Sequence, residues 1–179
     1  TTRDNDNEQK AETQDSTLGG SAPCEVKMEA VVSDAAIFRE WQITSDPSFN
    51  DVMLRANELE YTHTFSDMGT FYIRFVCADA SGACEWISDT YTVFIGESRL
   101  LCPNAFSPNA SPGVNDEWKV SYRSLVSFEC HIFNKWGVKI AELTDPSQGW
   151  DGKHGGKYVP AGVYYYVIKA VGADGVKYD

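Results

Sequence analysis

The stretch Gly69–Gly82, GTFYIRFVCADASG, begins at a glycine, continues as an aromatic and branched run, and ends near a second glycine. Successive residues of such a run point to opposite faces of a β-strand. The stretch therefore predicts a half-buried strand followed by a glycine-containing turn. The face that we expect to be apolar carries Phe71, Ile73, Phe75 and Cys77.

The same pattern recurs later in the chain. In Gly162–Gly175, GVYYYVIKAVGADG, a glycine again begins an aromatic strand and a second glycine turns it. Shorter alternating runs lie at Tyr91–Ile95 and Phe128–Phe133, and we interpret FNDVMLRANELEY as two short strands around Ala56 and Asn57. Turn residues interrupt the runs about every ten residues, which is typical of sandwiches. We predict an all-β protein with two small Ig-like β-sandwich modules in tandem.

The composition and the end of a β run indicate the domain boundaries. Residues 1–21 contain almost no apolar side chains, so this segment cannot repay its ordering entropy by burial and we expect a mostly disordered linker with room for a short edge strand. A β run ends in GESR at Gly96–Arg99. We therefore place the first module at 22–97 and the second at 98–179.

The charge of the 179-residue chain restricts its partners. Its formal net charge of -11 argues against binding to nucleic acid or to an anionic membrane surface, since both require a basic surface. The longest apolar run, VYYYVI, is far shorter than the ~20 residues of a membrane span. We expect a monomer without a membrane span and without a cofactor.

The chain contains five cysteines, with no C-x-x-C pair and no histidine spaced to complete a zinc site. This usage indicates disulfides and an oxidising compartment. The candidate pairs are Cys102 with Cys130, and Cys77 with Cys84; Cys24 with Cys84 competes with the latter.

The stretch GWDGK, Gly149–Lys153, leaves several roles open for Asp151: catalytic acid, metal ligand or turn residue. An Asp-Gly pair favours a hairpin corner, because Asp binds its own backbone and Gly accepts a positive φ. We therefore predict a turn at Asp151 and packing of Trp150 as a core or edge aromatic.

A glycosidase would need two carboxylates that face one cleft. The candidates all lie in turn-like sequence: Asp116, Glu117, Asp145 and Asp151. The sequence has no G-x-S-x-G elbow, phosphate loop or dinucleotide motif. A calcium site in Ser107–Trp118 would have only two adjacent carboxylates. We predict no enzyme activity and no metal site, with a glycosidase as the enzymatic alternative.

Five ordered motifs follow in the second module: CPNAFSPN (102–109), GVND (113–116), IFNKWG (132–137), GWDGK and VPAGVYYYVIKA (159–170). In this order they resemble the gliding motility-associated C-terminal domain, the type B sorting domain of the type IX secretion system. The resemblance implies a small Ig-like sandwich of an exported, secreted or cell-surface protein. Its partners would be the outer-membrane secretion machinery and the cell envelope.

The sequence departs from the family pattern at two places, and the resemblance identifies the motif positions of this chain. The family's Asn-Gly-Asp-Gly loop is replaced by Asn-Ala-Ser-Pro-Gly at 109–113, and a closing strand would have only Val176–Asp179 after the GADG hairpin. The positions carried over as the sorting-domain motif are Pro103, Asn104, Phe106, Pro108, Asn115, Asp116, Asn134, Trp136, Gly137, Trp150, Asp151, Gly152, Gly162 and Tyr164.

Residues 20–95 resemble a PKD-like or Ig-like module, with GSAPCEVKM as the opening strand and Trp41 as the core tryptophan. This implies a spacer or adhesion unit, with a glycan or a protein as its ligand. The alternative function is a carbohydrate-binding or adhesive module. That alternative predicts a planar row of exposed rings among Trp86, Trp118, Trp136 and Trp150.

Overall fold

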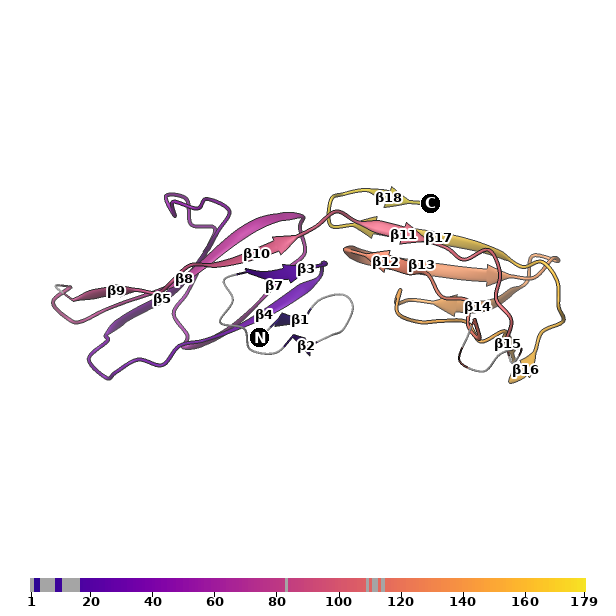
Figure 1. Cartoon of the computed structure of the whole chain (residues 1–179), viewed down its shortest axis with the longest axis horizontal. Coiled ribbons are helices and arrows are strands. Elements are labelled where there is room, and N and C mark those ends of the chain that lie inside the picture. Colours follow the sequence, from indigo (N-terminus) through magenta and orange to yellow (C-terminus); the bar gives the residue numbers. More distant parts are fainter. Residues whose placement is uncertain are drawn as a thin grey trace. The chain divides into compact units, whose positions relative to one another are not determined.

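The computed structural model describes residues 2–3, 9–10, 17–82, 84–108, 110, 113 and 115–179. All of its regular elements are strands, so the prediction of an all-β chain is confirmed for these residues (Figure 1). None of them forms a helix long and apolar enough to cross a membrane. The chain divides into two compact units, Thr1–Gly96 and Glu97–Asp179.

The first unit contains two sheets. One sheet has the order β2 (Gln9–Lys10), β1 (Thr2–Arg3), β4 (Cys24–Glu29) and β7 (Glu60–Phe65). The second has the order β3 (Thr17–Gly20), β10 (Tyr91–Ile95), β8 (Gly69–Ala78), β5 (Phe38–Thr44) and β6 (Leu54–Ala56), and β9 (Glu85–Ile87) also pairs with β8. β3 runs parallel to β10, whereas the other pairs are antiparallel.

The strands of the first unit follow the alternation in the sequence. β8 begins at Gly69 as predicted and buries Ile73 and Phe75. The two short strands predicted around Ala56 and Asn57 are confirmed as β6 and β7. The edge strand allowed for in residues 1–21 includes β3, where a Cβ on Gly19 would lie 2.5 Å from the Phe94 carbonyl oxygen. Much of that segment lies outside the described residues.

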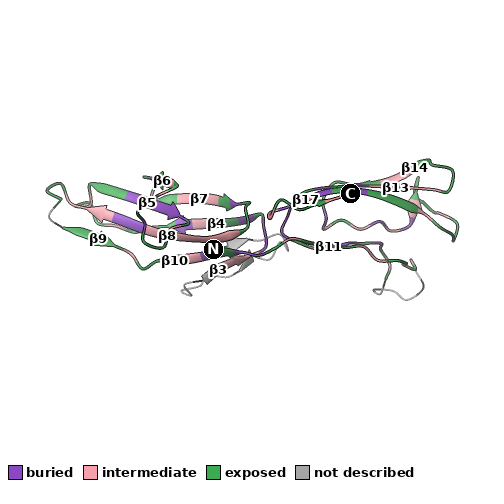
Figure 2. Cartoon of the chain, turned by 90° about the horizontal axis from the view of Figure 1, so that it is seen from above, coloured by how far each residue is buried: buried purple, intermediate pink, exposed green. Residues whose placement is uncertain are grey.

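β5 is buried on both faces, as the purple segments of Figure 2 show. On one face Trp41 packs on Phe75 with 4.7 Å between ring centroids. On the other face Gln42 donates to Glu40 at 2.7 Å, and Glu40 forms an ion pair with Arg55. These buried polar groups are therefore satisfied within the sheet, as their removal from water requires.

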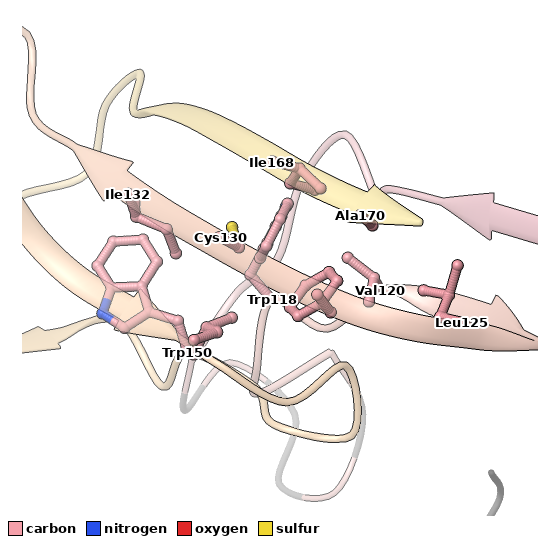
Figure 3. Packing of buried hydrophobic residues seen from close by; sticks show 10 residues of the cluster. Trp118, Val120, Leu125, Cys130, Ile132, Trp150, Ile168 and Ala170 are labelled. Carbon is pink, nitrogen blue, oxygen red and sulfur yellow. The ribbon is translucent and has the colours of Figure 1, made fainter. Parts of the chain in front are cut away.

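The second unit is built around one antiparallel four-stranded sheet. Its strand order is β14 (Lys139–Leu143), β13 (Leu125–Phe133), β17 (Tyr165–Gly172) and β18 (Lys177–Tyr178). Two smaller pairs accompany it: β11 (Arg99–Leu101) with β12 (Ser121–Arg123), and β15 (Lys153–His154) with β16 (Lys157–Tyr158). Side chains from alternate positions of β13 and β17 join two tryptophans in the core (Figure 3): Trp118, Leu125, Phe128, Cys130, Ile132, Trp150, Ile168 and Ala170.

Two details of the last strands bear on the sequence prediction. β17 begins at Tyr165 and not at Gly162, because Pro160–Tyr164 bends and the Tyr164 hydroxyl donates to the Pro160 carbonyl at 2.6 Å. The residues after Gly175 do form a short closing strand, since Lys177–Tyr178 pairs with β17.

The hairpin between β17 and β18 is fastened to the start of the unit. The Ser98 amide donates to Asp174 Oδ2 at 2.8 Å, and the Ser98 hydroxyl lies 2.8 Å from both Asp174 Oδ1 and the Tyr178 hydroxyl. This approach requires a glycine at 172, because a Cβ there would lie 2.3 Å from Ser98 Cβ. Burial opposes ionisation of Asp174, but the hydrogen bonds from Ser98 lower the pKa of this carboxyl.

Replacing Asp174 should therefore destabilise the unit in a pH-dependent way. A carboxyl whose pKa is lowered in the folded state stabilises it above the unfolded pKa of about 3.9, and this contribution is lost as the pH falls through the folded value. We expect Asp174→Asn to lower the free energy of unfolding by about 1–2 kcal/mol at neutral pH. The loss should shrink as the pH falls from about 3.9 through the lowered pKa of the folded state.

Urea unfolding followed by tryptophan fluorescence measures this effect. Asp145→Asn is the matched control, because the Asp145 carboxylate accepts from the amide and hydroxyl of Ser147 within its own turn. If Asp174→Asn lowered the free energy of unfolding equally at neutral and acid pH, the result would contradict a role of the Asp174 charge.

Candidate functional site

The second unit contains a pocket of about 630 Å³ whose walls are mainly aromatic and apolar. Two segments line most of it, residues 103–108 and residues 158–166. The remaining wall is formed by Trp118, Ile132, Trp150 and Gly152. The pocket thus combines residues that are distant in the sequence, and its shape depends on how these segments are held against the core.

Two buried tryptophans hold these segments. Trp118 and Trp150 exchange both backbone hydrogen bonds, at 2.9 and 3.0 Å, in an isolated antiparallel bridge. The Trp118 indole N–H donates to the Pro103 carbonyl at 2.9 Å, and the Trp150 indole N–H donates to the Lys153 carbonyl at 2.9 Å. Most buried indole N–H groups have such a partner. Figure 3 shows both rings in the core, and each ring connects it to a loop beside the pocket through its N–H group.

Aromatic contacts continue from these two rings into the pocket wall. Trp150 lies 5.3 Å from Phe106 and 5.4 Å from Tyr164 between ring centroids, and Trp118 lies 4.9 Å from Tyr166. All three pairs have the tilted or edge-on geometry that aromatic quadrupoles favour. The wall is therefore a continuous extension of the core.

Asp151 lies in a turn and is engaged there. Its Oδ1 accepts from the Lys153 amide at 3.0 Å, and its Oδ2 lies 2.9 Å from Lys153 Nζ. The contact with the Lys153 side chain lowers the pKa of Asp151, so the carboxyl is ionised at neutral pH and unsuited to act as a general acid.

The predicted hairpin corner at Asp151–Gly152 is wrong in position. The two-residue corner between β15 and β16 is Gly155–Gly156, where both residues have positive φ as a type I′ turn requires. Gly152 lies at the open end of this hairpin, and its carbonyl accepts from the Val159 amide at 2.9 Å.

The IFNKWG motif forms the turn between β13 and β14. Asn134 Oδ1 accepts from the Trp136 amide at 2.9 Å and from the Val138 amide at 3.0 Å, and Gly137 has a φ of 78°. The Trp136 side chain is 78% exposed, and Lys135 Nζ lies 5.0 Å from its ring centre. This motif therefore shapes a turn and presents one open ring.

The GVND motif also shapes a loop. Asn115 has a φ of 55°, and its carbonyl accepts from the Ser107 amide at 2.8 Å. Asp116 Oδ2 accepts from the Gly113 amide at 2.5 Å. These contacts position the end of the segment that lines the pocket.

The structure thus brings some of the motif residues together and separates others. Those that line the pocket are Pro103, Asn104, Phe106, Pro108, Trp150, Gly152, Gly162 and Tyr164. Those that shape turns or loops outside the pocket lining are Asn115, Asp116, Asn134, Trp136, Gly137 and Asp151. The pocket is also lined by five aromatic or branched residues outside the predicted motif positions: Trp118, Ile132, Tyr158, Tyr165 and Tyr166. Their aromatic or branched character next to turn residues was the available signal.

The candidate carboxylates of a glycosidase do not behave as a catalytic pair. Asp116, Asp145 and Asp151 each accept from a backbone amide of their own turn, and Glu117 is exposed. The glycosidase alternative therefore has no support from the described residues. The planar row of tryptophans is not formed either, because Trp118 and Trp150 are 6% and 5% exposed. Trp86 and Trp136 are the exposed members.

All five cysteines are described, and all five are free thiols. The register places Trp86 opposite Cys77, so Cys84 is at best a diagonal neighbour. Diagonal neighbours lie ~7–8 Å apart, beyond the usual reach of a disulfide. Cys102 packs against the cluster that contains Cys130, and burial together with the neighbouring Cys102 raises the pKa of Cys130 to about 12.

A concave aromatic pocket of about 630 Å³ has the size and lining of a candidate binding site. The sequence model of the CHU_C Type IX secretion signal domain matches residues 100–178. The match confirms the resemblance drawn from the five motifs of the second unit. Such a signal indicates an exported protein that is secreted or attached to the cell surface. No curated protein and no solved structure matches the chain.

The pocket wall should be sensitive to substitution at Gly152. This residue has a φ of 77°, and a Cβ would lie 2.9 Å from Pro108 Cγ. We expect Gly152→Ala to destabilise the second unit by about 2 kcal/mol, because a left-handed backbone is costly for other residues and the loop must shift.

Gly162→Ala is the matched control. Gly162 also lines the pocket, but its Cβ would meet no atom within 4 Å. We expect Gly162→Ala to change the free energy of unfolding, measured by chemical denaturation, by less than about 0.5 kcal/mol. Equal losses for the two variants would show that Gly152 is not needed for the close approach.

Proposed function

We propose that the second unit is a sorting domain whose aromatic pocket is the surface read by the outer-membrane type IX machinery. The observation that supports this proposal most directly is the position of the family motifs. Eight of the predicted motif residues line one pocket, although they come from three separate motifs in the chain. Residues that serve only the fold would be spread over the whole core.

The rim of the pocket offers apolar surface to a partner. The exposed side chains that line it include Tyr158 at 49%, Val163 at 68% and Tyr165 at 58%. Exposed aromatic groups around a concave site favour protein recognition, because they release much apolar area from water at a small entropic cost.

We propose that the first unit is a spacer with an Ig-like sandwich fold. One of its sheets places β10, β8 and β5 side by side, and the other pairs β4 with β7. This arrangement is the one found in Ig-like sandwiches. An adhesive role and a glycan or protein ligand of this unit stay predictions.

Export of a fused carrier tests the sorting proposal. The full chain is placed behind a secreted fluorescent carrier in a host with the type IX machinery, and surface exposure is scored by added protease. We expect delivery to the surface, and retention of the carrier in the periplasm when residues 97–179 are deleted. Tyr158→Ala and Tyr165→Ala should each lower delivery about tenfold, as loss of a recognition contact does.

Val126→Ala is the matched control, since this residue of β13 is 40% exposed and does not line the pocket. Circular dichroism and thermal unfolding establish that each variant is folded. Unchanged delivery after the deletion would contradict the sorting role. Loss of delivery only on deletion, with both tyrosine variants active, would place the recognised surface elsewhere on the unit.

We further propose that Cys102 and Cys130 form a disulfide once the protein has left the cytoplasm. The two thiols lie close enough for Cys102 to shift the pKa of Cys130, and both influence Tyr166. Closing the bond removes two protons and two electrons, which a thiol oxidase of the exported compartment would accept.

Peptide mapping of the secreted protein without reductant should recover the two cysteines in one linked peptide pair. Cys102→Ser should then cost about 2–4 kcal/mol of stability, whereas Cys77→Ser should cost less. Alkylation of both thiols in the folded secreted protein would contradict the bond.

A further inference from the structure

Three potential metal ligands meet on the face of β13 and β14 that points away from the core. Glu129 and His131 are two positions apart on β13, so they share a face. Glu142 of β14 lies directly opposite His131 in the register. Their neighbours Phe128, Cys130 and Ile132 belong to the core cluster, which places the three ligands on the outer face.

The donor atoms of these side chains are close together. His131 Nε2 lies 3.1 Å from Glu129 Oε1 and 3.7 Å from Glu142 Oε1. One ligand atom from each residue lies within 4.8 Å of the other two. Ligands bound at ~2.0–2.2 Å around one tetrahedral ion are themselves ~3.3–3.6 Å apart. The cluster therefore needs only a small contraction to surround an ion.

We infer that Glu129, His131 and Glu142 form a binding site for a divalent transition-metal ion of the zinc class. One imidazole and two carboxylates suit such an ion better than calcium or magnesium, which prefer ligand sets made only of oxygen. The site goes beyond the sorting function and shares no residue with the pocket. It also departs from the sequence analysis, which predicted no metal site.

The surroundings favour binding without rearrangement of the backbone. β13 is a central strand, paired on both sides by β14 and β17. The His131 side chain is 28% exposed and lies edge-on to Phe133 at 6.3 Å between ring centroids. The ladder between β13 and the edge strand β14 holds the three ligands in place, so little conformational entropy is lost on binding.

The charged groups around the cluster have defined positions. Lys139 Nζ binds Glu142 Oε2 at 2.6 Å, which leaves Oε1 on the side of His131. The contact with Lys139 lowers the pKa of Glu142, so this ligand is ionised at neutral pH. Lys169 of β17 lies opposite Glu129 in the register and adds a second positive charge near the site.

Three protein ligands leave the fourth tetrahedral position to water or to a group of a partner. An ion in this place would connect β14, the edge strand of the sheet, to the central strand β13. It would therefore stabilise the second unit against unfolding, by mass action with the free ion.

Titration of the full chain with ZnCl₂ in a chelator-free buffer, followed by calorimetry, tests the inference. We expect one site in the wild-type chain and at least about a tenfold rise in Kd for His131→Ala, since loss of even an outer partner of a ligand has this effect. Glu129→Gln and Glu142→Gln keep the side-chain size and should weaken binding in the same direction. The wild type, but not these variants, should gain thermal stability with zinc.

His154→Ala is the control for adventitious binding. His154 is exposed in the same unit, with Nδ1 2.9 Å from the Ile140 carbonyl, and does not belong to the cluster. We expect this variant to bind zinc as the wild type does, and we expect the NMR signals of His131 in the wild type to move on titration. Equal Kd values for the wild type and His131→Ala, or the absence of binding, would overturn the inference.

Discussion

The second unit depends on the bridge between Trp118 and Trp150. Their two backbone hydrogen bonds connect the segment after the GVND motif with the GWDGK motif. Their indole N–H groups then bind the carbonyls of Pro103 and Lys153. Both side chains are buried, so the loss of either indole hydrogen bond would leave an unsatisfied N–H donor in the core. This cost holds the loops in one arrangement and gives the pocket a fixed shape.

The bridge explains why motifs so far apart in the sequence describe one site. Phe106 contacts Trp150 from the first motif, and Tyr164 contacts the same ring from the last. Gly152 permits Pro108 to approach at a distance that a Cβ would prevent. The residues of a secretion signal can thus be recognised as a sequence pattern because one buried aromatic pair brings them together.

The elements that could be predicted from the sequence are those with a local pattern. Alternation placed β8, β10 and β13, and the ordered motifs led to the family and to eight pocket residues. Contacts set by register had no local signal. Ser98 meets Asp174, and His131 meets Glu142, only because distant segments pair. The position of the hairpin corner failed for a related reason, since Asp151–Gly152 and Gly155–Gly156 have similar turn chemistry and the pairing of β15 with β16 decides between them.

β13 connects the two sites of this unit, because its side chains alternate between the core and the outer face. Ile132 supports the pocket from one face, while Glu129 and His131 stand on the other. A shift of register by one residue would therefore exchange the two sets and destroy both sites. The irregularities in pairing lie between Leu125 and Ser127 on one side and between Ile132 and Phe133 on the other. The part of β13 that carries Glu129, His131 and Ile132 lies between these irregularities and is regularly paired. The surface that would be read by a partner and the surface that would bind an ion therefore depend on the same ladder. Their residues lie on opposite faces, so each set can change in sequence independently.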